Sequence, residues 1–432
     1  MLALTDLPGD IHDHIAGFLP DKDFVQFLCA SRQITVSAYL RRDRQRAHWK
    51  KCGAAYLAIK GNLQGLQYLH SVNVVVGTTD AMVLAAKHGH LAVVEFLHSI
   101  GATCTEEGMN WTARHGHLAV VQFLHHIGVR CSKANDAMNW AARYGHLGVV
   151  EFLHSIGAPC TSDAMDAAAE NGHLAVVEFL HSAGARCTAY AMNHAAGNGH
   201  LPVVQLLYRI GTRCTVGAMN WAGQNGHLPV VAFLHSIGVP PTTYAMDWAA
   251  SKGHLPLVQF LHSIGGSATT NGMENAAGHG HLAVVQFLHG IGAPYKPQAM
   301  DYAAKHGHLA VVEFFWNIGA SCTVQAMVGA AYHGHLDMVK FLHSIGVPCT
   351  HEAMDLAAYY GRLPVVEYLH SIGAKCTAEA MDWTAYHGHL PVVKFLHSIG
   401  APYTSKAIHW ATSKGHLAVV EFLQGFLENI TA

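Results

Sequence analysis

The chain has 432 residues, of which 51% are apolar and 12% are charged, and its formal net charge is −2 at pH 7. This near-neutral charge disfavours nucleic-acid binding, which normally requires a basic surface. No apolar run approaches the ~20 residues that cross a bilayer, and the start of the chain lacks a secretory signal pattern, so we expect an intracellular protein without membrane association, cytoplasmic or alternatively nuclear.

The first fifty residues lie outside the repeat that fills the rest of the chain. Their apolar residues follow helical spacing that Pro8 and Pro20 interrupt. The string from Leu7 to Asp23 resembles an F-box, with Leu-Pro, an Ile pair, Phe-Leu-Pro and Asp at that family's spacing. The resemblance implies docking on the Skp1 subunit of a cullin-RING ubiquitin ligase. The implied docking residues are Leu7, Pro8, Ile11, Ile15, Phe18, Leu19, Asp23 and Phe24.

Two other interpretations of this region remain open. The usual Val-Ser-Arg-x-Trp ending of the F-box is here Ala-Ser-Arg-Gln-Ile at 30–34, and the segment can instead be a helical cap over the end of a repeat stack. The basic run at 41–46 fits either a nuclear localisation signal or a solvated helix that joins two modules.

The dipeptide Ala-Met, or a close variant, returns every 27 residues from Ala81 to Ala407, with one step of 29 residues after Gly108. The two additional residues fall within 132–136, between helices, where insertions are tolerated. If Gly61–Leu63 is a degenerate copy, about fourteen units occupy residues 51–432, and the first and last of them act as caps. Residues 1–50 then form the F-box-like module and a connecting helix.

One unit, residues 161–187, illustrates the expected local structure. Thr161 is placed to N-cap a short helix that Gly172 ends, and a second helix follows His173 and closes at Gly184. Other units carry proline at the second position of that later helix, which only a first turn tolerates. Those prolines are Pro202, Pro229, Pro256, Pro364 and Pro391.

Helical spacing predicts which apolar residues of this unit face inward. They are Met165, Ala168, Ala169, Leu174, Val177, Phe179 and Leu180. One helix pair is too small to bury them alone, so neighbouring pairs must stack. The predicted fold class is therefore all-α, a solenoid of short helix pairs.

The pattern Ala-Ala-x-x-Gly-His-Leu-x-Val-Val-x-Phe-Leu-x-x-x-Gly-Ala resembles the ankyrin repeat from the end of its first helix through its second. The resemblance covers residues from about 51 to 432 and implies an ankyrin-type α-solenoid. Ankyrin's Thr-Pro-Leu-His is replaced here by x-Ala-Met-Asp or x-Ala-Met-Asn, and the unit is about six residues too short for a projecting hairpin. The combination with an F-box resembles the F-box/ankyrin proteins of large DNA viruses of protists, which would place the chain in the host cytoplasm.

Cysteine and histidine recur at fixed repeat positions, which raises the question of metal binding. Eight of the ten cysteines share one position, and most of the 36 histidines follow either Gly or Phe-Leu. Equivalent atoms in stacked helices are about 10 Å apart, too far for disulfides or for shared zinc ligation. We therefore expect reduced, half-buried thiols, and histidines that are structural or that point their polar ends into solvent. We expect neither metal nor cofactor.

Two further repeat positions carry the candidate partner contacts. Tryptophan recurs directly before the Ala-Ala pair of the first helix, or before a variant of that pair. There it either packs between repeats or forms a contact surface. The pair that follows Ala-Ala varies most, and by analogy with ankyrin proteins it lines the concave face; free drift of a solvated surface is the alternative. The candidates are Trp111, Arg114, His115, Trp140, Arg143, Tyr144, Trp221, Trp248, Tyr302, Tyr332, Tyr359, Tyr360, Trp383 and Tyr386.

No nucleophile elbow, phosphate-binding loop or placed carboxylate pair occurs, so the sequence predicts a binding scaffold and not an enzyme. The first hypothesis is an adaptor that recruits a target protein to a ubiquitin ligase through the F-box-like segment. The second is a ligase-independent scaffold or decoy whose N-terminus is only a cap.

Overall fold

The computed structural model describes the chain from residue 36 to 130 and from 136 to 431. Within these ranges the regular structure is entirely helical, with 28 helices and no strand, which confirms the all-α prediction. The F-box-like residues Leu7, Pro8, Ile11, Ile15, Phe18, Leu19, Asp23 and Phe24 lie outside the described residues.

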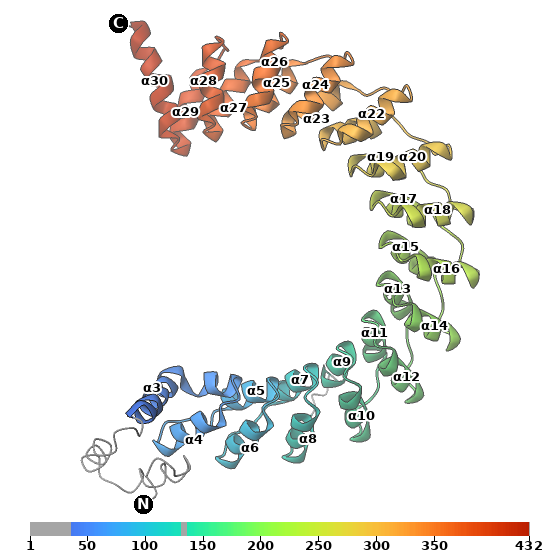
Figure 1. Cartoon of the computed structure of the whole chain (residues 1–432), viewed down its shortest axis with the longest axis vertical. Coiled ribbons are helices and arrows are strands. Elements are labelled where there is room, and N and C mark those ends of the chain that lie inside the picture. The colour runs from blue at the N-terminus through green and yellow to red at the C-terminus, as the bar shows by residue number, and fades with distance from the viewer. Residues whose placement is uncertain (1–35, 131–135, 432) are drawn as a thin grey trace, which may run out of the picture. The chain divides into compact units, whose positions relative to one another are not determined.

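The helices alternate between first and second members of fourteen pairs (Figure 1), with α3 contributing the first helix of the first pair. They are α3 (Val36–Ile59), α4 (Leu63–Ser71), α5 (Thr79–Lys87), α6 (Leu91–Ser99), α7 (Glu106–Arg114), α8 (Leu118–His126), α9 (Asp136–Arg143), α10 (Leu147–Ser155), α11 (Ser162–Glu170), α12 (Leu174–Ser182), α13 (Ala189–Gly197), α14 (Leu201–Arg209), α15 (Val216–Gln224), α16 (Leu228–Ser236), α17 (Thr243–Ser251), α18 (Leu255–Ser263), α19 (Thr270–Gly278), α20 (Leu282–Gly290), α21 (Gln298–Lys305), α22 (Leu309–Asn317), α23 (Val324–His333), α24 (Leu336–Ser344), α25 (His351–Tyr359), α26 (Leu363–Ser371), α27 (Ala378–His387), α28 (Leu390–Ser398), α29 (Ser405–Lys414) and α30 (Leu417–Thr431).

The described helices divide into two compact units. One holds the helices up to residue 168 together with 173–186, and the other holds 169–172 and the helices from 187 onward. Within each unit, the first helices of neighbouring pairs pack against one another more extensively than the second helices do. Each unit therefore has a close-packed side made of first helices and a more open side made of second helices.

Threonine and glycine set the limits of most helix pairs. Thr377, for example, caps α27 because its side chain accepts a hydrogen bond from the Glu379 N–H at 3.2 Å. Gly388 ends the same helix with φ of 74°, a left-handed conformation that glycine adopts without strain. The five prolines predicted at the start of second helices all lie in a first turn.

The core is a repeated set of small and medium side chains. In the unit at 161–187, Met165, Ala168, Ala169, Val177 and Leu180 are buried as predicted. The prediction for Leu174 and Phe179 was wrong, because the second helix turns residues 176, 177 and 180 to the core. Leu174 and Phe179 are accordingly only half-buried, whereas Val176 is buried.

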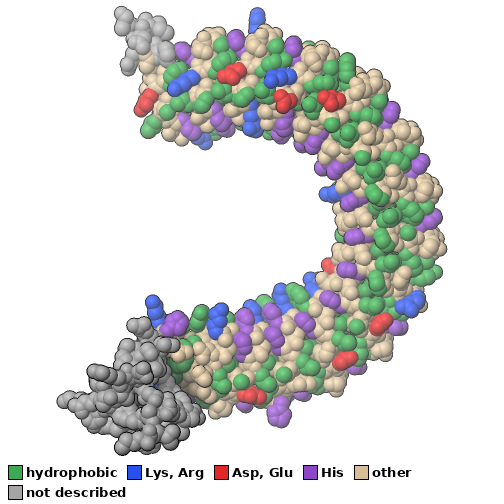
Figure 2. Space-filling model, in the orientation of Figure 1, with side chains coloured by type: hydrophobic (Ala, Val, Ile, Leu, Met, Phe, Trp, Pro, Cys, Tyr) green, Lys and Arg blue, Asp and Glu red, His purple; other side chains and the backbone are tan. Residues whose placement is uncertain are grey.

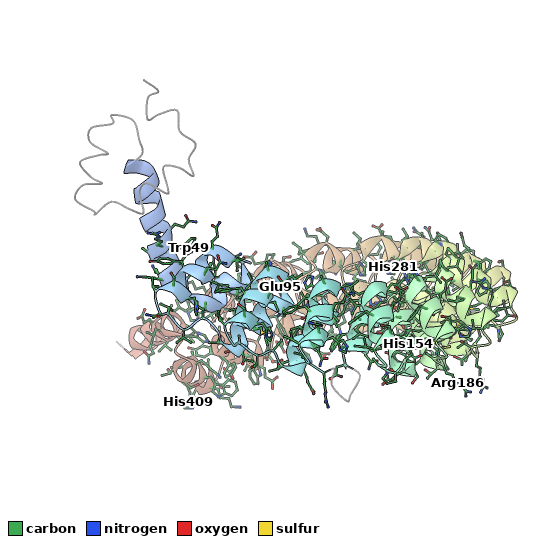
Figure 3. The ribbon with its side chains drawn as sticks, turned by 90° about the horizontal axis from the view of Figure 1, so that it is seen from below. Trp49, Glu95, His154, Arg186, His281 and His409 are labelled. Atoms are coloured by element: carbon green, nitrogen blue, oxygen red, sulfur yellow. The ribbon has the colours of Figure 1, made fainter. Side chains whose placement is uncertain are left out.

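The helix α3 leads into the repeats and crosses the expected domain boundary near residue 50. It contains a break at Gly53, where φ is 75° and ψ is 169°. Trp49 lies just before this break (Figure 3), and its ring is 5.8 Å from that of Tyr68 on α4. The Arg46 guanidinium lies 5.3 Å from the same tyrosine ring. The end of α3 that precedes Gly53 is thereby anchored to the first helix pair.

Candidate protein-binding face

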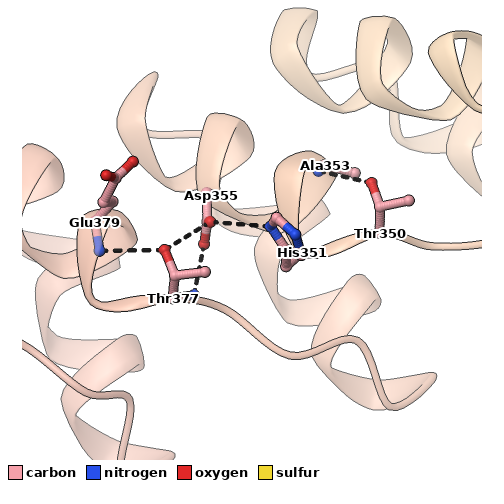
Figure 4. A network of polar contacts seen from close by, with 6 residues as sticks. All are labelled: Thr350, His351, Ala353, Asp355, Thr377 and Glu379. Carbon is pink, nitrogen blue, oxygen red and sulfur yellow. Dashed lines mark hydrogen bonds and ion pairs between the residues drawn. The ribbon is translucent and has the colours of Figure 1, made fainter.

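Adjacent first helices are tied by a polar link that spans 22 residues of sequence. The aspartate of the Ala-Met-Asp motif accepts two hydrogen bonds from the N-cap threonine of the next pair (Figure 4). For Asp355 and Thr377 the distances are 2.9 Å from the backbone N–H to Oδ1 and 2.8 Å from Oγ1 to Oδ2. Asp247, Asp301 and Asp382 make the same pair of bonds with the threonines 22 residues later.

Asparagine makes a reduced form of this link. The hydroxyl of Thr161 donates to Asn139 Oδ1 at 3.0 Å, and that of Thr215 donates to Asn193 Oδ1 at 2.8 Å. The geometry of this link follows from the stacking of repeats, since the two partners are distant in sequence.

The histidine of the Gly-His-Leu motif provides a second link between neighbouring pairs. Its Nε2 donates to a backbone carbonyl at the end of the preceding first helix, as from His90 to Ile59 at 2.9 Å and from His146 to Arg114 at 3.0 Å. Because a carbonyl oxygen only accepts, Nε2 carries the proton in these rings. Burial is the main cause that lowers the pKa of several of them, including His117.

The histidine after Phe-Leu lies on the second helices and serves a different purpose. Its ring meets the phenylalanine of the next second helix edge to face, with centroid distances of 5.8 Å for His98 and Phe123 and 5.6 Å for His154 and Phe179. These histidines are solvent-exposed, and Figure 2 shows histidine side chains recurring along the surface of both units. The described residues contain no cluster of His, Cys, Asp and Glu that could hold a metal ion.

The cysteines of the described chain are partly buried, as the sequence predicts. Cys104, Cys160, Cys187, Cys214, Cys322, Cys349 and Cys376 are free and half-buried, as is Cys52. Burial raises the pKa of Cys104 to about 11, so this group is a neutral thiol at physiological pH.

We call the surface formed by the exposed sides of the first helices the first-helix face. In the compact unit that ends near residue 186, the centre of this face is Arg114. Its guanidinium lies 5.0 Å from the ring of Trp111 and 4.5 Å from that of Trp140. The same group donates to the Tyr144 hydroxyl at 2.8 Å. The Lys87 ammonium, from α5, lies 4.3 Å from the Trp111 ring. Cations and aromatic rings therefore alternate along α5, α7 and α9.

In the compact unit that holds the helices from residue 187 onward, the first-helix face carries a continuous aromatic cluster near α25 and α27. Tyr332 and Tyr360 are 4.2 Å apart, Tyr359 lies 5.6 Å from Trp383, and Trp383 lies 4.8 Å from Trp410. A hydrogen bond to the Tyr332 side chain is the main cause that raises the pKa of Tyr360 to about 12. Tyr386 joins the cluster through Trp383 at 5.5 Å.

The remaining predicted residues lie on this face at separate points. Trp221 is 46% exposed and packs 4.8 Å from His194, while Trp248 lies 5.8 Å from Tyr244. Tyr302 is 45% exposed and lines a cavity of about 660 Å³. His115 is exposed beside Trp111, and Arg143 is half-buried one helix further along.

The two interpretations of the tryptophan position are thus compatible, because each indole packs on a neighbouring side chain and keeps part of its surface exposed. The predicted set left out Lys87, Trp410 and Lys414, although all three occupy the same repeat positions as its members. The Lys414 ammonium lies 4.8 Å from the Tyr386 ring. The repeat register alone would have found these residues.

The family model of ankyrin repeats, in three copies, matches residues 82–166 and 109–190. The ankyrin repeat domain of human ASB11 matches the structure with a TM-score of 0.39 and 17% sequence identity, covering 44% of this chain and 99% of that domain. Comparison with curated protein sequences gave no match.

The described chain is an all-helical solenoid of stacked helix pairs, as the sequence predicts, and its residues 82–190 match the ankyrin-repeat family model. Ankyrin repeats, which the family model matches at residues 82–190, indicate a protein–protein interaction scaffold. None of the described helices is both long and apolar enough to cross a membrane.

Proposed function

We propose that this protein recruits a target protein through its first-helix face and presents it to a ubiquitin ligase through the F-box-like segment at residues 7–24. The observation that carries the first half is the concentration of aromatic and cationic side chains on the first-helix face of each compact unit, from Lys87 to Trp140 in one and from Tyr332 to Trp410 in the other. Tryptophan, tyrosine and arginine side chains are enriched at the energetic centres of protein interfaces.

The first-helix face can be tested against a matched control on the second helices. Tyr144 and Trp221 are 41% and 46% exposed on first helices, while Tyr208 and Trp316 are 46% and 45% exposed on second helices. We expect the double variant Tyr144→Ala and Trp221→Ala to lose specific partners in quantitative affinity purification, and Tyr208→Ala with Trp316→Ala to retain them. Equal loss, or equal retention, in both double variants would remove the first-helix face as the binding surface.

The ligase half of the proposal rests on the F-box resemblance alone and needs its own test. We expect the intact chain to bind purified Skp1, and Leu7→Asp or Ile15→Asp to abolish that binding without changing the thermal melt of the repeats. An intact chain that does not bind Skp1, or binding that neither substitution alters, would contradict it.

A second function is a ligase-independent scaffold or decoy in which the N-terminus only caps the stack. The packing of Trp49 and Arg46 against Tyr68 favours a structural role for at least the adjoining part of α3. In that case, deletion of residues 1–45 should reduce the stability of the first helix pairs, and target binding should persist. The intact chain should not bind Skp1.

A further inference from the structure

The link between first helices is missing where α19 meets α21. Glu274 occupies the aspartate position of the Ala-Met-Asp motif, but the residue 22 positions later is Lys296 and not threonine. The N-cap of α21 is Pro297, which makes no side-chain cap. Glu274 Oε1 is shielded from water and has no hydrogen-bond partner among the described residues.

Glu274 lines a cavity of about 660 Å³ on the first-helix face. Two small residues open this cavity. Asn275 occupies the position of Trp248 and Trp383 in other pairs, and Gly278 occupies the position of Arg114 and Tyr332. Because Gly278 has no side chain, the ring of Tyr302 forms an uncovered wall that is 45% exposed.

The chemistry of the cavity favours a cation with hydrogen-bond donors. Glu274 is its acidic lining residue, and the other polar walls include the rings of His279, His306 and His308. Burial and the neighbouring Lys305 are the main causes that lower the pKa of His306, so this ring is neutral at pH 7. A shielded carboxylate oxygen without a donor is unfavourable, and the soft terminal torsion of glutamate lets it turn toward a donor in the cavity.

We propose that this cavity binds the guanidinium of an arginine side chain from a partner protein. The planar group can donate two hydrogen bonds to the Glu274 carboxylate while its face lies on the Tyr302 ring, an arrangement that an ammonium does not match. The inference rests on the proposed use of the first-helix face for partner binding, and it adds a position at which the partner's side chain is specified.

The probe is N-acetyl-arginine methylamide, titrated into the full-length protein, with the N-acetyl-citrulline analogue as an uncharged control of the same shape. Binding is followed by NMR of the histidine ring protons. We expect arginine to cause saturable shifts at His279, His306 and His308 with a millimolar dissociation constant, and citrulline to cause at least tenfold weaker effects. Equal effects of the two compounds would overturn the proposal.

Two variants locate the binding and separate it from folding. Glu274→Gln should weaken arginine binding at least tenfold, whereas Glu313→Gln, the same charge change on the exposed side of α22, should leave it unchanged. The double variant Glu274→Asp with Lys296→Thr restores the aspartate–threonine link, so it should raise the melting temperature and also abolish arginine binding. Undiminished binding by either Glu274 variant would contradict the assignment.

The small-molecule titration does not depend on any protein partner. If arginine binds but the Tyr144 and Trp221 variants keep their partners, the arginine site is supported and partner binding by the first-helix face is contradicted. If those variants lose their partners but arginine does not bind, partner binding by the first-helix face is supported and the arginine site is contradicted.

Discussion

Most Gly-His-Leu motifs owe their glycine to two separate requirements. Gly89 has φ of 77°, and a Cβ atom at this position would lie 2.5 Å from Nδ1 of His117, whose ring packs over it from the next pair. Gly101 closes the following second helix with φ of 90°, but a Cβ there would meet no atom within 4 Å. The two glycines share a backbone requirement, and only the first also leaves room for a neighbouring side chain.

This difference predicts unequal effects of the same substitution. Gly101→Ala should cost about 1–2 kcal/mol of unfolding free energy, the ordinary penalty for a left-handed alanine. Gly89→Ala should cost more, by about 1 kcal/mol or above, because it also displaces the His117 ring and its hydrogen bond. Urea denaturation of both variants measures the difference, and equal losses would show that the histidine packing contributes nothing.

The helix pairs are held in register by polar links as well as by their apolar core. The core alone is nearly uniform along the stack, because Ala, Met, Val and Leu recur at the same positions. The bonds from Thr377 to Asp355 join α25 to α27 at one defined offset. We interpret the aspartate or asparagine of each motif as the residue that fixes how one first helix lies against the next.

Removal of one such link should destabilise the two helices that it joins. Asp355→Ala leaves the N–H and hydroxyl of Thr377 without their acceptor and should cost about 1.5–3 kcal/mol, typical for hydrogen bonds to a charged group. Asp355→Asn should cost less, since Asn139 and Asn193 accept the same threonine hydroxyl elsewhere. Glu367→Ala, exposed on α26, is the charge-matched control and should cost under about 0.5 kcal/mol.

Hydrogen exchange in α25 and α27 locates the loss, because stability in stacked repeats is carried by neighbouring interfaces. Faster exchange confined to these helices in Asp355→Ala is the expected pattern. If Asp355→Ala and Glu367→Ala exchange alike, the link does not stabilise the interface.

Over the described chain as a whole, half-buried histidines couple stability to pH. Burial is the leading cause that lowers the pKa values of His117, His254, His281, His335 and His389 below the ordinary 6.5. The unfolded chain therefore binds protons more readily than the folded chain, and the folded state loses stability as pH falls below about 6.5.

We expect the melting temperature, measured by circular dichroism, to be level above pH 7 and to decrease steadily between about pH 6.5 and 5. His281→Gln and His389→Gln in one chain should reduce the size of this decrease while lowering stability at pH 7.5. A melting temperature that stays constant from pH 7.5 to 5 would contradict the prediction.

The amino-acid sequence by itself determined the period of 27 residues, the two helices of each unit, their threonine and glycine limits, and most of the core. These features are local, because helical spacing and capping depend on residues within a few positions of each other. The same reasoning misplaced Phe179 and Leu174, which are only half-buried, and it left out the buried Val176.

Only the tertiary structure decided what each recurring polar residue contacts. The partner of His90 is the carbonyl of Ile59, that of Asp355 is Thr377, and Glu274 has none among the described residues. Periodicity shows that a residue returns to the same side of its helix, but the distance and offset between neighbouring pairs determine which atoms it meets there. The alternating cations and rings around Arg114, and the cavity beside Tyr302, exist for the same reason: each is formed by side chains that stacking brings together from different repeats.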